Sequence, residues 1–191
     1  MTEPELQKKE PQEKPFSLKN EIYEWLESGV FALTVVVLIF TFLFRIVMVD
    51  GRSMQPTLQD QDRVITVSLF YKPAPGDIVV VTQPNAMNHS LIKRVIAVEG
   101  QTVFIDPETG DVSVDGKVLT EPYIMEKINP SKIGDMKYPL TLKDGEVFVM
   151  GDNRNNSSDS RDSMIGIIDE RYILGKAVLR IFPISDISVL R

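Results

Sequence analysis

The sequence predicts a mainly β protein, with one N-terminal transmembrane helix followed by an all-β domain that forms a barrel or two packed sheets. Two observations predict this fold class. An uncharged apolar run near the N-terminus is long enough to cross a bilayer. The chain behind it consists of short segments rich in Val and Ile, separated by turn residues. The 191 residues leave room for one domain of ordinary size plus these N-terminal segments.

Residues 1–27 are dominated by Glu, Lys, Gln and Pro and predict a flexible, solvated tail. Residues 29–44 carry no charge. With the residues up to 49 they give about 20 residues, the length that crosses a hydrocarbon layer of ~30 Å. Tyr23 and Trp25 stand just before the run, where membrane proteins have an aromatic belt. We therefore predict a membrane anchor at 28–49.

Two other structures share this apolar pattern. A buried core helix is one, but such helices rarely carry so long an uncharged run on every face. A cleaved signal peptide is the other, but its apolar region is shorter, and Val47-Met48-Val49 is not a small-residue cleavage site. The four lysines among residues 1–27, against seven acids, weakly favour a cytoplasmic N-terminus under the positive-inside rule.

Residues 50–191 predict the β-rich domain, because their apolar segments are short, β-branched and bounded by turn residues. Asp115-Gly116 lies between two such segments and predicts a two-residue hairpin turn. No long stretch of this domain has the 3.6-residue period of an amphipathic helix. The expected strands are 63–70, 77–82, 91–98, 102–106, 112–119, 146–150 and 176–182.

The composition argues against several kinds of site. The chain has no cysteine, which excludes disulfides, zinc–thiolate sites and cysteine nucleophiles. Its single histidine, His89, cannot form a multi-histidine metal site, and we expect neither a metal ion nor a cofactor. A net charge of −6 does not fit the clustered basic surface of a nucleic-acid-binding protein, so we expect no nucleic-acid partner.

Three polar segments interrupt the expected strands. In the first, Ser53 lies between Gly51 and Pro56 on a tight turn that would fix its hydroxyl, although a serine in this setting is usually an ordinary loop residue. The second is Lys93 in the run 91–96, where alternation leaves apolar residues on both faces. Lys93 is either a surface lysine with a buried stem or a buried amine whose lowered pKa lets it act as a base.

The third polar segment is the run 151–161, GDNRNNSSDSR, directly after the expected strand 146–150. One interpretation is a solvated loop. However, Arg154 and Arg161 both have carboxylates close in sequence, so the other interpretation is a rigid network of mutually satisfied polar groups.

In their order and spacing these segments resemble the bacterial type I signal peptidases, also called leader peptidases, which are serine–lysine dyad proteases. Residues 53–58 (SMQPTL) resemble the nucleophile motif of this family, and residues 76–80 (GDIVV) resemble the strand that follows it. Residues 93–96 (KRVI) are similar to its lysine segment, and residues 151–161 to its last and most distinctive motif. The resemblance covers the anchor and almost all of the domain behind it, and it implies a catalytic domain of the signal-peptidase type.

The resemblance also implies roles for particular residues. Ser53 would be the nucleophile and Lys93 the general base, with the Ser157 hydroxyl orienting the lysine amine by a hydrogen bond. Gly51 stands where some members carry a serine whose hydroxyl helps to bind the oxyanion. The oxyanion would therefore rely on the Ser53 backbone N–H and on a donor that the sequence does not identify. Structural ion pairs around the site would be formed by Arg94, Asp152, Asp159 and Arg161. The substrate pockets, which accept small side chains at the first and third positions before the cut, would be lined by Val49, Leu58 and Ile92.

The function implied by the resemblance is the removal of N-terminal signal peptides from exported preproteins, through an acyl-enzyme on Ser53. The expected partners are signal-peptide-bearing preproteins and the lipid bilayer, with no obligate protein partner. The expected location is the plasma membrane, crossed once, with the catalytic domain on the outer or periplasmic face; a thylakoid-type membrane fits the sequence as well. Four residues separate Met48 from Ser53, a reach of at most about 15–20 Å, which predicts a site close to the bilayer surface.

Three alternatives remain. His89 is a rival base, but it lies four residues from Lys93 in the loop 83–90, where no acid would orient its ring. A membrane-anchored, non-catalytic β domain that binds peptides by strand addition would have the same strands. A self-cleaving repressor of the related serine–lysine class would need a DNA-binding helical domain in the place that the anchor occupies.

Overall fold

The computed structural model describes residues 18–82 and 90–190, with the exception of the Phe42 side chain. The chain divides into two compact units, Met1–Ile39 and Phe40–Arg191. Most of helix α1 (Leu18–Leu43) belongs to the first unit, and the β strands belong to the second. The fold is mainly β with one N-terminal helix, which confirms the predicted fold class.

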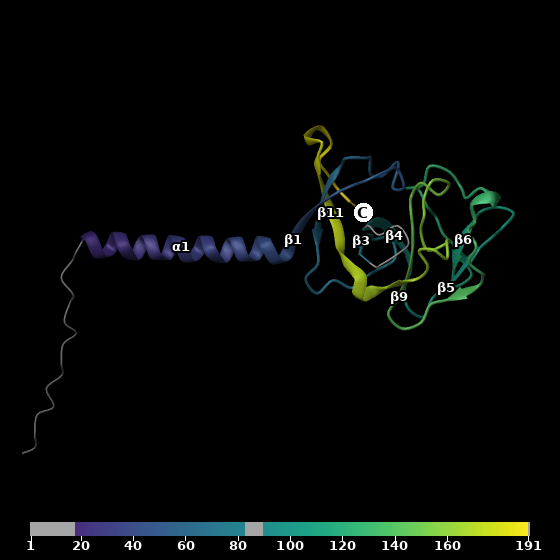
Figure 1. The fold of residues 1–191 in the computed structure, drawn as a ribbon, viewed down its shortest axis with the longest axis horizontal. Helices are drawn as coiled ribbons and strands as arrows, with labels where there is room; N and C mark the ends of the chain where they lie inside the picture. Colours follow the sequence, from purple (N-terminus) through teal and green to yellow (C-terminus); the bar gives the residue numbers. More distant parts are fainter. Residues whose placement is uncertain (1–17, 83–89, 191) are drawn as a thin grey trace, which may run out of the picture. The chain divides into compact units, whose positions relative to one another are not determined.

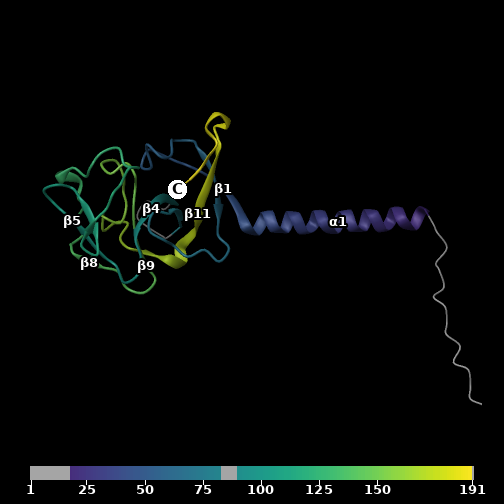
Figure 2. The same cartoon turned by 180° about the vertical axis from the view of Figure 1, so that it is seen from behind.

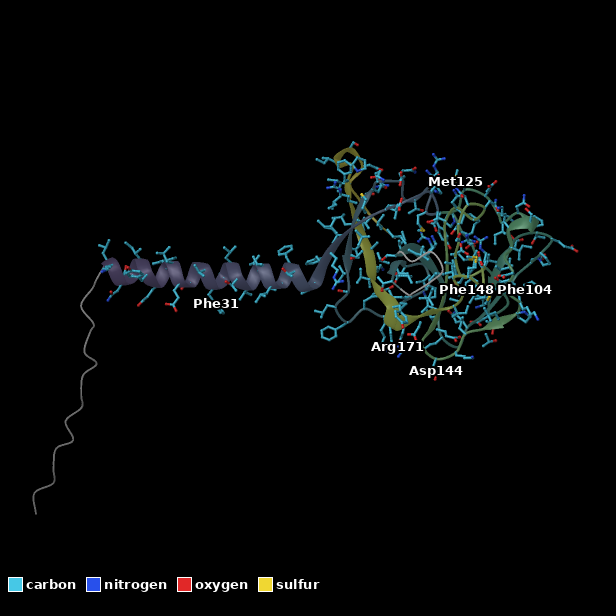
Figure 3. The ribbon with its side chains drawn as sticks, viewed as in Figure 1. Phe31, Phe104, Met125, Asp144, Phe148 and Arg171 are labelled. Atoms are coloured by element: carbon cyan, nitrogen blue, oxygen red, sulfur yellow. The ribbon has the colours of Figure 1, made fainter. Side chains whose placement is uncertain are left out.

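From Gly29 onward, helix α1 is apolar around its whole circumference. Side chains project from every side of the helix, and Phe31 is 70% exposed (Figure 3). Within Leu18–Thr41 an 18-residue stretch has a mean hydropathy of 1.7, and by length and composition the segment can cross a membrane. Among the described residues it is the one helix with these properties. A helix that is apolar on all faces needs an apolar environment, which a bilayer provides.

The boundaries of α1 differ from those expected for the tail and the anchor. The helix begins at Leu18, so residues 18–27, which were expected in the flexible tail, are helical. Glu21 lies in the first turn, where a negative charge stabilises the helix N-terminus. Residues 1–17, the rest of the expected tail, lie outside the described part of the chain.

At its other end, α1 stops at Leu43, short of the expected end of the anchor at residue 49. The next five residues form strand β1 (Phe44–Met48), which pairs with β2 (Arg63–Val67) so that Ile46 lies opposite Ile65. The β-branched residues of this segment favour an extended backbone, and pairing with β2 stabilises it further. An apolar run alone does not distinguish a buried or lipid-facing helix from a strand of this kind.

The β strands form two antiparallel sheets. The larger has the order β1-β2-β11-β3-β4-β9-β10, with β12 added to β11, and the smaller has the order β7-β6-β5-β8. Within the domain, β1 and β11 lie at one end and β5 at the other, with β4 between them (Figures 1 and 2). The remaining strands of the larger sheet are β3 (Ile78–Val81), β4 (Leu91–Ala97), β9 (Glu146–Met150), β10 (Ile168–Asp169), β11 (Ile173–Phe182) and β12 (Ser188–Val189). The strands of the smaller sheet are β5 (Thr102–Ile105), β6 (Val112–Val114), β7 (Lys117–Val118) and β8 (Leu140–Thr141). Short 3₁₀ helices are η1 (Pro130–Lys132), η2 (Glu170–Tyr172) and η3 (Ile184–Asp186).

The hairpin expected at Asp115-Gly116 is confirmed. Val114 pairs with Lys117 across the turn between β6 and β7. Both turn residues have positive φ, 51° and 77°, as a two-residue turn of the primed type requires.

Two apolar clusters position the site. One joins the two sheets, with members from both that include Ile96, Phe148, Met150, Val103, Ile105 and Val112. The other lies beneath the turn that follows β1 and contains Val49, Met54, Leu58, Val64, Ile78, Ala177 and Leu190.

Strand β4 has a central place between β3 and β9. Val79 of β3 lies opposite Lys93, and Met150, the last residue of β9, lies opposite Arg94. The polar loop that begins at Gly151 therefore leaves the sheet beside Lys93.

Candidate active site

Ser53 lies in a turn that is held from below. Met54 and Leu58 are 1% and 0% exposed and pack into the apolar cluster beneath the turn. The Leu58 N–H donates to Met54 O at 2.9 Å. Gly51 has a φ of +88°, which favours glycine, and its N–H donates to Asp60 Oδ1 at 2.8 Å. The turn therefore presents the Ser53 hydroxyl in a defined direction.

Lys93 projects from β4 toward that hydroxyl. Its Nζ lies 2.7 Å from Ser53 Oγ, a hydrogen-bond distance, and the residue is 2% exposed. The interpretation of Lys93 as a surface lysine is thus wrong. Burial lowers the pKa of Lys93 from 10.5 to about 8; the charge of Asp159 opposes this shift and that of Arg161 adds to it.

Arg94, the next residue of β4, is also buried and makes a bidentate ion pair. Its Nε and Nη2 donate to the two carboxylate oxygens of Asp152 at 2.8 and 2.7 Å, and its Nη1 donates to Gly76 O at 2.7 Å. The guanidinium also lies over the ring of Tyr123, with 4.0 Å between Cζ and the ring centroid. Asp152 accepts a further hydrogen bond from the hydroxyl of Thr57, which lies in the same turn as Ser53.

A second buried pair holds the far end of the polar loop. Arg161 Nε and Nη2 donate to Asp159 at 2.8 and 2.9 Å, and the Gly151 N–H donates to Asp159 Oδ2 at 2.9 Å. Burial alone would raise the pKa of Asp159, but its hydrogen bonds and the charge of Arg161 hold that pKa below its ordinary value. The four residues expected to form structural ion pairs therefore form two, Arg94–Asp152 and Arg161–Asp159.

This geometry places a hydroxyl beside a buried amine with a lowered pKa, an arrangement suited to a nucleophile and its base. A protein-family model described as signal peptidase, peptidase S26, matches residues 22–182 of the chain. The chain belongs to this family.

Individual relatives agree with the family model. The signal peptidase I of Bacillus licheniformis is 34% identical over 92% of this chain and 97% of its own. Signal peptidase I T of Bacillus subtilis is 36% identical over 87% of this chain and 89% of its own. A crystal structure of a signal peptidase I from Enterococcus faecalis covers 56% of this chain and 98% of that one, with 27% identity and a TM-score of 0.46. The resemblance inferred from the motifs is confirmed.

In this S26 peptidase, Ser157 does not make the hydrogen bond expected of it. Its Oγ is buried and makes no hydrogen bond to Lys93; its hydroxyl lies near the Asp159 carboxylate and helps to hold the pKa of that group down. The hydroxyl instead lies against Gly151, since a Cβ built on that glycine would be 2.3 Å from it. The expected hydrogen bond from Ser157 to the Lys93 amine is therefore not formed in this structure.

A cavity of about 300 Å³ opens over the pair Ser53–Lys93. Val49 and Ile92 line it, as expected for substrate-binding residues. Leu58 does not line it, because Leu58 is fully buried in the cluster beneath the turn. Val49 belongs to that cluster and also lines the cavity. The rest of the wall comes from segments 47–54 and 90–93 and from Asn156 and Ser158.

Two residues of the S26 peptidase site were not singled out in the sequence. Asn153 joins the polar loop to the turn that carries Ser53: its backbone N–H donates to Ser53 O at 2.9 Å and its Nδ2 to Arg52 O at 3.1 Å. Glu121 accepts hydrogen bonds from Arg154 at 2.6 and 2.8 Å, across 33 positions of sequence. No sequence spacing predicts either contact, because in each case the two partners come together only when the sheets assemble.

Two further expectations concern a metal ion and the rival base His89. Within them, no group of three or more His, Cys, Asp or Glu side chains is placed to hold a metal ion. His89, the rival base, lies outside the described part of the chain.

Proposed function

We propose that this protein is a membrane-bound endopeptidase that removes signal peptides from exported preproteins, with Ser53 as nucleophile and Lys93 as general base. Membership of a family of signal peptidases supports the substrate class. The mechanism is supported most directly by the 2.7 Å between Lys93 Nζ and Ser53 Oγ. A serine hydroxyl needs an adjacent base, and a lysine serves as one only while its amine is neutral.

The surroundings of Lys93 favour that neutral amine. With a pKa of about 8, roughly one lysine in ten is neutral at pH 7, whereas at the ordinary pKa fewer than about one in a thousand would be. The two buried carboxylates nearby, Asp152 and Asp159, are each paired with an arginine, Arg94 and Arg161 respectively. The amine therefore has no unpaired negative charge beside it that would favour its protonated form.

The proposed reaction follows from these positions. The neutral Lys93 amine takes the Ser53 hydroxyl proton while Oγ attacks the scissile carbonyl, and the carbonyl oxygen becomes an oxyanion. Collapse of this intermediate breaks the C–N bond, and the protonated Lys93 gives its proton to the leaving amine. A water molecule, deprotonated by the neutral Lys93, then hydrolyses the acyl-enzyme and releases the signal peptide with a new carboxylate.

The walls of the cavity suit an extended peptide with small side chains. β1 is the end strand of its sheet, and β9 pairs with β4 only from Arg94 onward, so among the described residues no strand pairs with the outer edge of β1 or with the start of β4 on its β9 side. A peptide can add to such an edge as a further strand. Val49 and Ile92 would then face alternate side chains of the peptide, and the limited volume supports small residues at the first and third positions before the cut.

A lipid bilayer is the proposed second partner. Helix α1 supports it by length and composition. A row of apolar residues on the domain supports it as well. The row runs across four strands, in which directly opposite residues are Ile46, Ile65, Leu179 and Val189. Its two end members, Ile46 and Val189, are 65% and 69% exposed. Isolated apolar residues are common on protein surfaces, but a continuous row of them indicates a binding surface. We propose a plasma-membrane location with the N-terminus in the cytoplasm and the domain on the outer face.

The decisive experiment incubates the purified full-length protein, in detergent, with a preprotein whose signal peptide ends in Ala-X-Ala. Mass spectrometry should show cleavage after the second alanine. Ser53→Ala and Lys93→Ala should each lower kcat/KM by at least about 1,000-fold. Ser131→Ala and Lys117→Ala, on exposed surface away from the cavity, serve as matched controls and should retain activity.

Two results would overturn the proposal. A non-catalytic peptide-binding domain would hold the preprotein but release no shortened product. A histidine mechanism would be indicated if His89→Ala abolished cleavage while Lys93→Ala left it near normal.

A further inference from the structure

The two peptide groups on either side of Ser53 are both held by one residue of the polar loop. The Asn153 side-chain Nδ2 donates to Arg52 O at 3.1 Å, and the Asn153 backbone N–H donates to Ser53 O at 2.9 Å. The Gln55 N–H also donates to Arg52 O, at 3.2 Å. Fixing the planes before and after a Cα atom fixes the φ and ψ of that residue. Asn153 therefore determines the backbone conformation of the proposed nucleophile.

The bond to Arg52 O has a consequence for the Ser53 N–H. Both groups belong to one peptide unit, and in a trans peptide the C=O and N–H point in opposite directions. Holding the Arg52 oxygen against the polar loop therefore aims the Ser53 N–H away from that loop. Within the described residues this N–H has no hydrogen-bond acceptor, and Ser53 lines the cavity. It is thus available to a substrate oxygen.

Gly51 makes this one donor more important. It has no hydroxyl to share the developing charge, and its own N–H is occupied by Asp60 Oδ1. Its φ of +88° would also strain any side chain placed there. A backbone donor stabilises an oxyanion only if it already points at the site where the charge develops.

We propose that Asn153 is a positioning residue of the oxyanion hole, which aims the Ser53 N–H by holding the Arg52 carbonyl. The inference rests on the proposed peptidase function. The hydrogen bond from Asn153 also polarises the peptide group, which strengthens its N–H as a donor. Asparagine suits the position because its side chain ends in a donor; an aspartate of nearly the same shape would present only acceptors to the Arg52 oxygen.

The test compares Asn153→Ala with Asn155→Ala in the full-length protein. Asn155 is a matched control, because it lies in the same loop but donates to Glu126 and to Lys127 O. We expect Asn153→Ala to lower kcat by about 10- to 100-fold with KM within about twofold, somewhat less than the loss of a whole oxyanion donor. Asn155 is half-buried and its side-chain hydrogen bonds are to residues 126–129, none of which is near Ser53, so Asn155→Ala should stay within about threefold of the wild-type kcat.

A second readout separates aiming of the donor from general damage. A peptide aldehyde matching the sequence before the cut adds to Ser53: a C–O bond forms, the carbonyl π electrons move to its oxygen, and the hydroxyl proton passes to Lys93. That oxygen then occupies the oxyanion position, whereas the matching peptide acid binds without this bond. In Asn153→Ala, affinity for the aldehyde should fall by the same factor as kcat/KM, and affinity for the acid should not change. The midpoint of the pH profile should stay near 8, because Lys93 is untouched.

The near-isosteric Asn153→Asp replaces the alanine variant if that variant unfolds, and it should lose at least as much kcat. The inference is overturned if both variants keep kcat within about twofold, or if aldehyde and acid affinities fall together. Failure of the peptidase proposal would look different, because wild-type protein would then not cleave the preprotein or Ser53→Ala would still cleave it.

Discussion

Gly151 is the residue at which a single added methyl group should disturb the proposed dyad. A Cβ at this position would lie 2.4 Å from Ser53 O and 2.3 Å from Ser157 Oγ, whereas ordinary contacts begin at 3.4 Å. Gly151 itself is held by its N–H donating to Asp159. Its preceding residue, Met150, is paired with Arg94 in the sheet. The strain of Gly151→Ala must therefore be relieved by a movement of about 1 Å in the nucleophile turn.

A movement of that size would lengthen the 2.7 Å separation of Ser53 Oγ and Lys93 Nζ beyond a hydrogen bond. Misplacement of reacting groups by 1 Å costs about 100-fold in rate, equivalent to about 2.7 kcal/mol of transition-state stabilisation. Gly151 is not among the residues with positive φ, so alanine adds a contact and no backbone strain. The expected loss is therefore in kcat, with a modest change in Tm.

The assay measures kcat, KM and Tm of the purified full-length variant on an Ala-X-Ala preprotein. Gly29→Ala is the control substitution, because a Cβ on Gly29 meets nothing within 4 Å. It should leave kcat unchanged. The reasoning is refuted if Gly151→Ala keeps more than half of the wild-type kcat with a normal Tm. It is refuted equally if the variant loses activity only because it has unfolded.

Three further predictions concern charge. If neutral Lys93 is the base, as proposed, kcat/KM should rise about tenfold between pH 7 and pH 9 around a midpoint near 8; a flat profile would contradict this. Lys93→Met should be inactive yet more stable at pH 7 by up to about 3 kcal/mol, because the folded state binds its proton less tightly than the unfolded chain. In urea titrations this difference should shrink as pH rises from 8 to 10.5, and a difference independent of pH would be inconsistent with a buried charge. Glu121→Ala should lower the free energy of unfolding by about 3 kcal/mol, since Arg154 stays buried and unpaired; recovery in the double variant with Arg154→Met tests the cause. For the proposed orientation, Asp144→Cys introduces the sole cysteine of the chain on an exposed turn, and a membrane-impermeant maleimide should label it in intact cells.

Local sequence patterns predicted those elements whose cause is local. The hairpin at Asp115-Gly116 follows from residues that tolerate positive φ, and strands such as β4 and β9 follow from β-branched runs bounded by turns. The strands β8, β10 and β12 have two residues each. No periodicity can be measured over so short a length, so pairing with a neighbouring strand is what defines them.

The features that the sequence did not predict arise from contacts between distant segments. Alternation placed Lys93 and Arg94 on opposite faces of β4, but it did not indicate that both faces are covered. Burial of Lys93 follows from the turn at Ser53, and burial of Arg94 from Asp152 and Tyr123. Which residue partners which is decided by the assembled sheets, and a single sequence does not contain that information in any spacing.

The adjacency of Lys93 and Arg94 in β4 makes two features of the site depend on one strand register. Arg94 binds both oxygens of Asp152 at the start of the polar loop, and Asp152 also accepts a hydrogen bond from Thr57 in the nucleophile turn. One face of β4 thus joins the nucleophile turn to the polar loop, while the other face directs the amine at Ser53. A shift of β4 by one residue would exchange these faces, placing a permanently charged guanidinium beside the hydroxyl and a lysine beside Asp152. Arginine is never a base at neutral pH, so the proposed dyad and the Arg94–Asp152 ion pair both require the same register of β4.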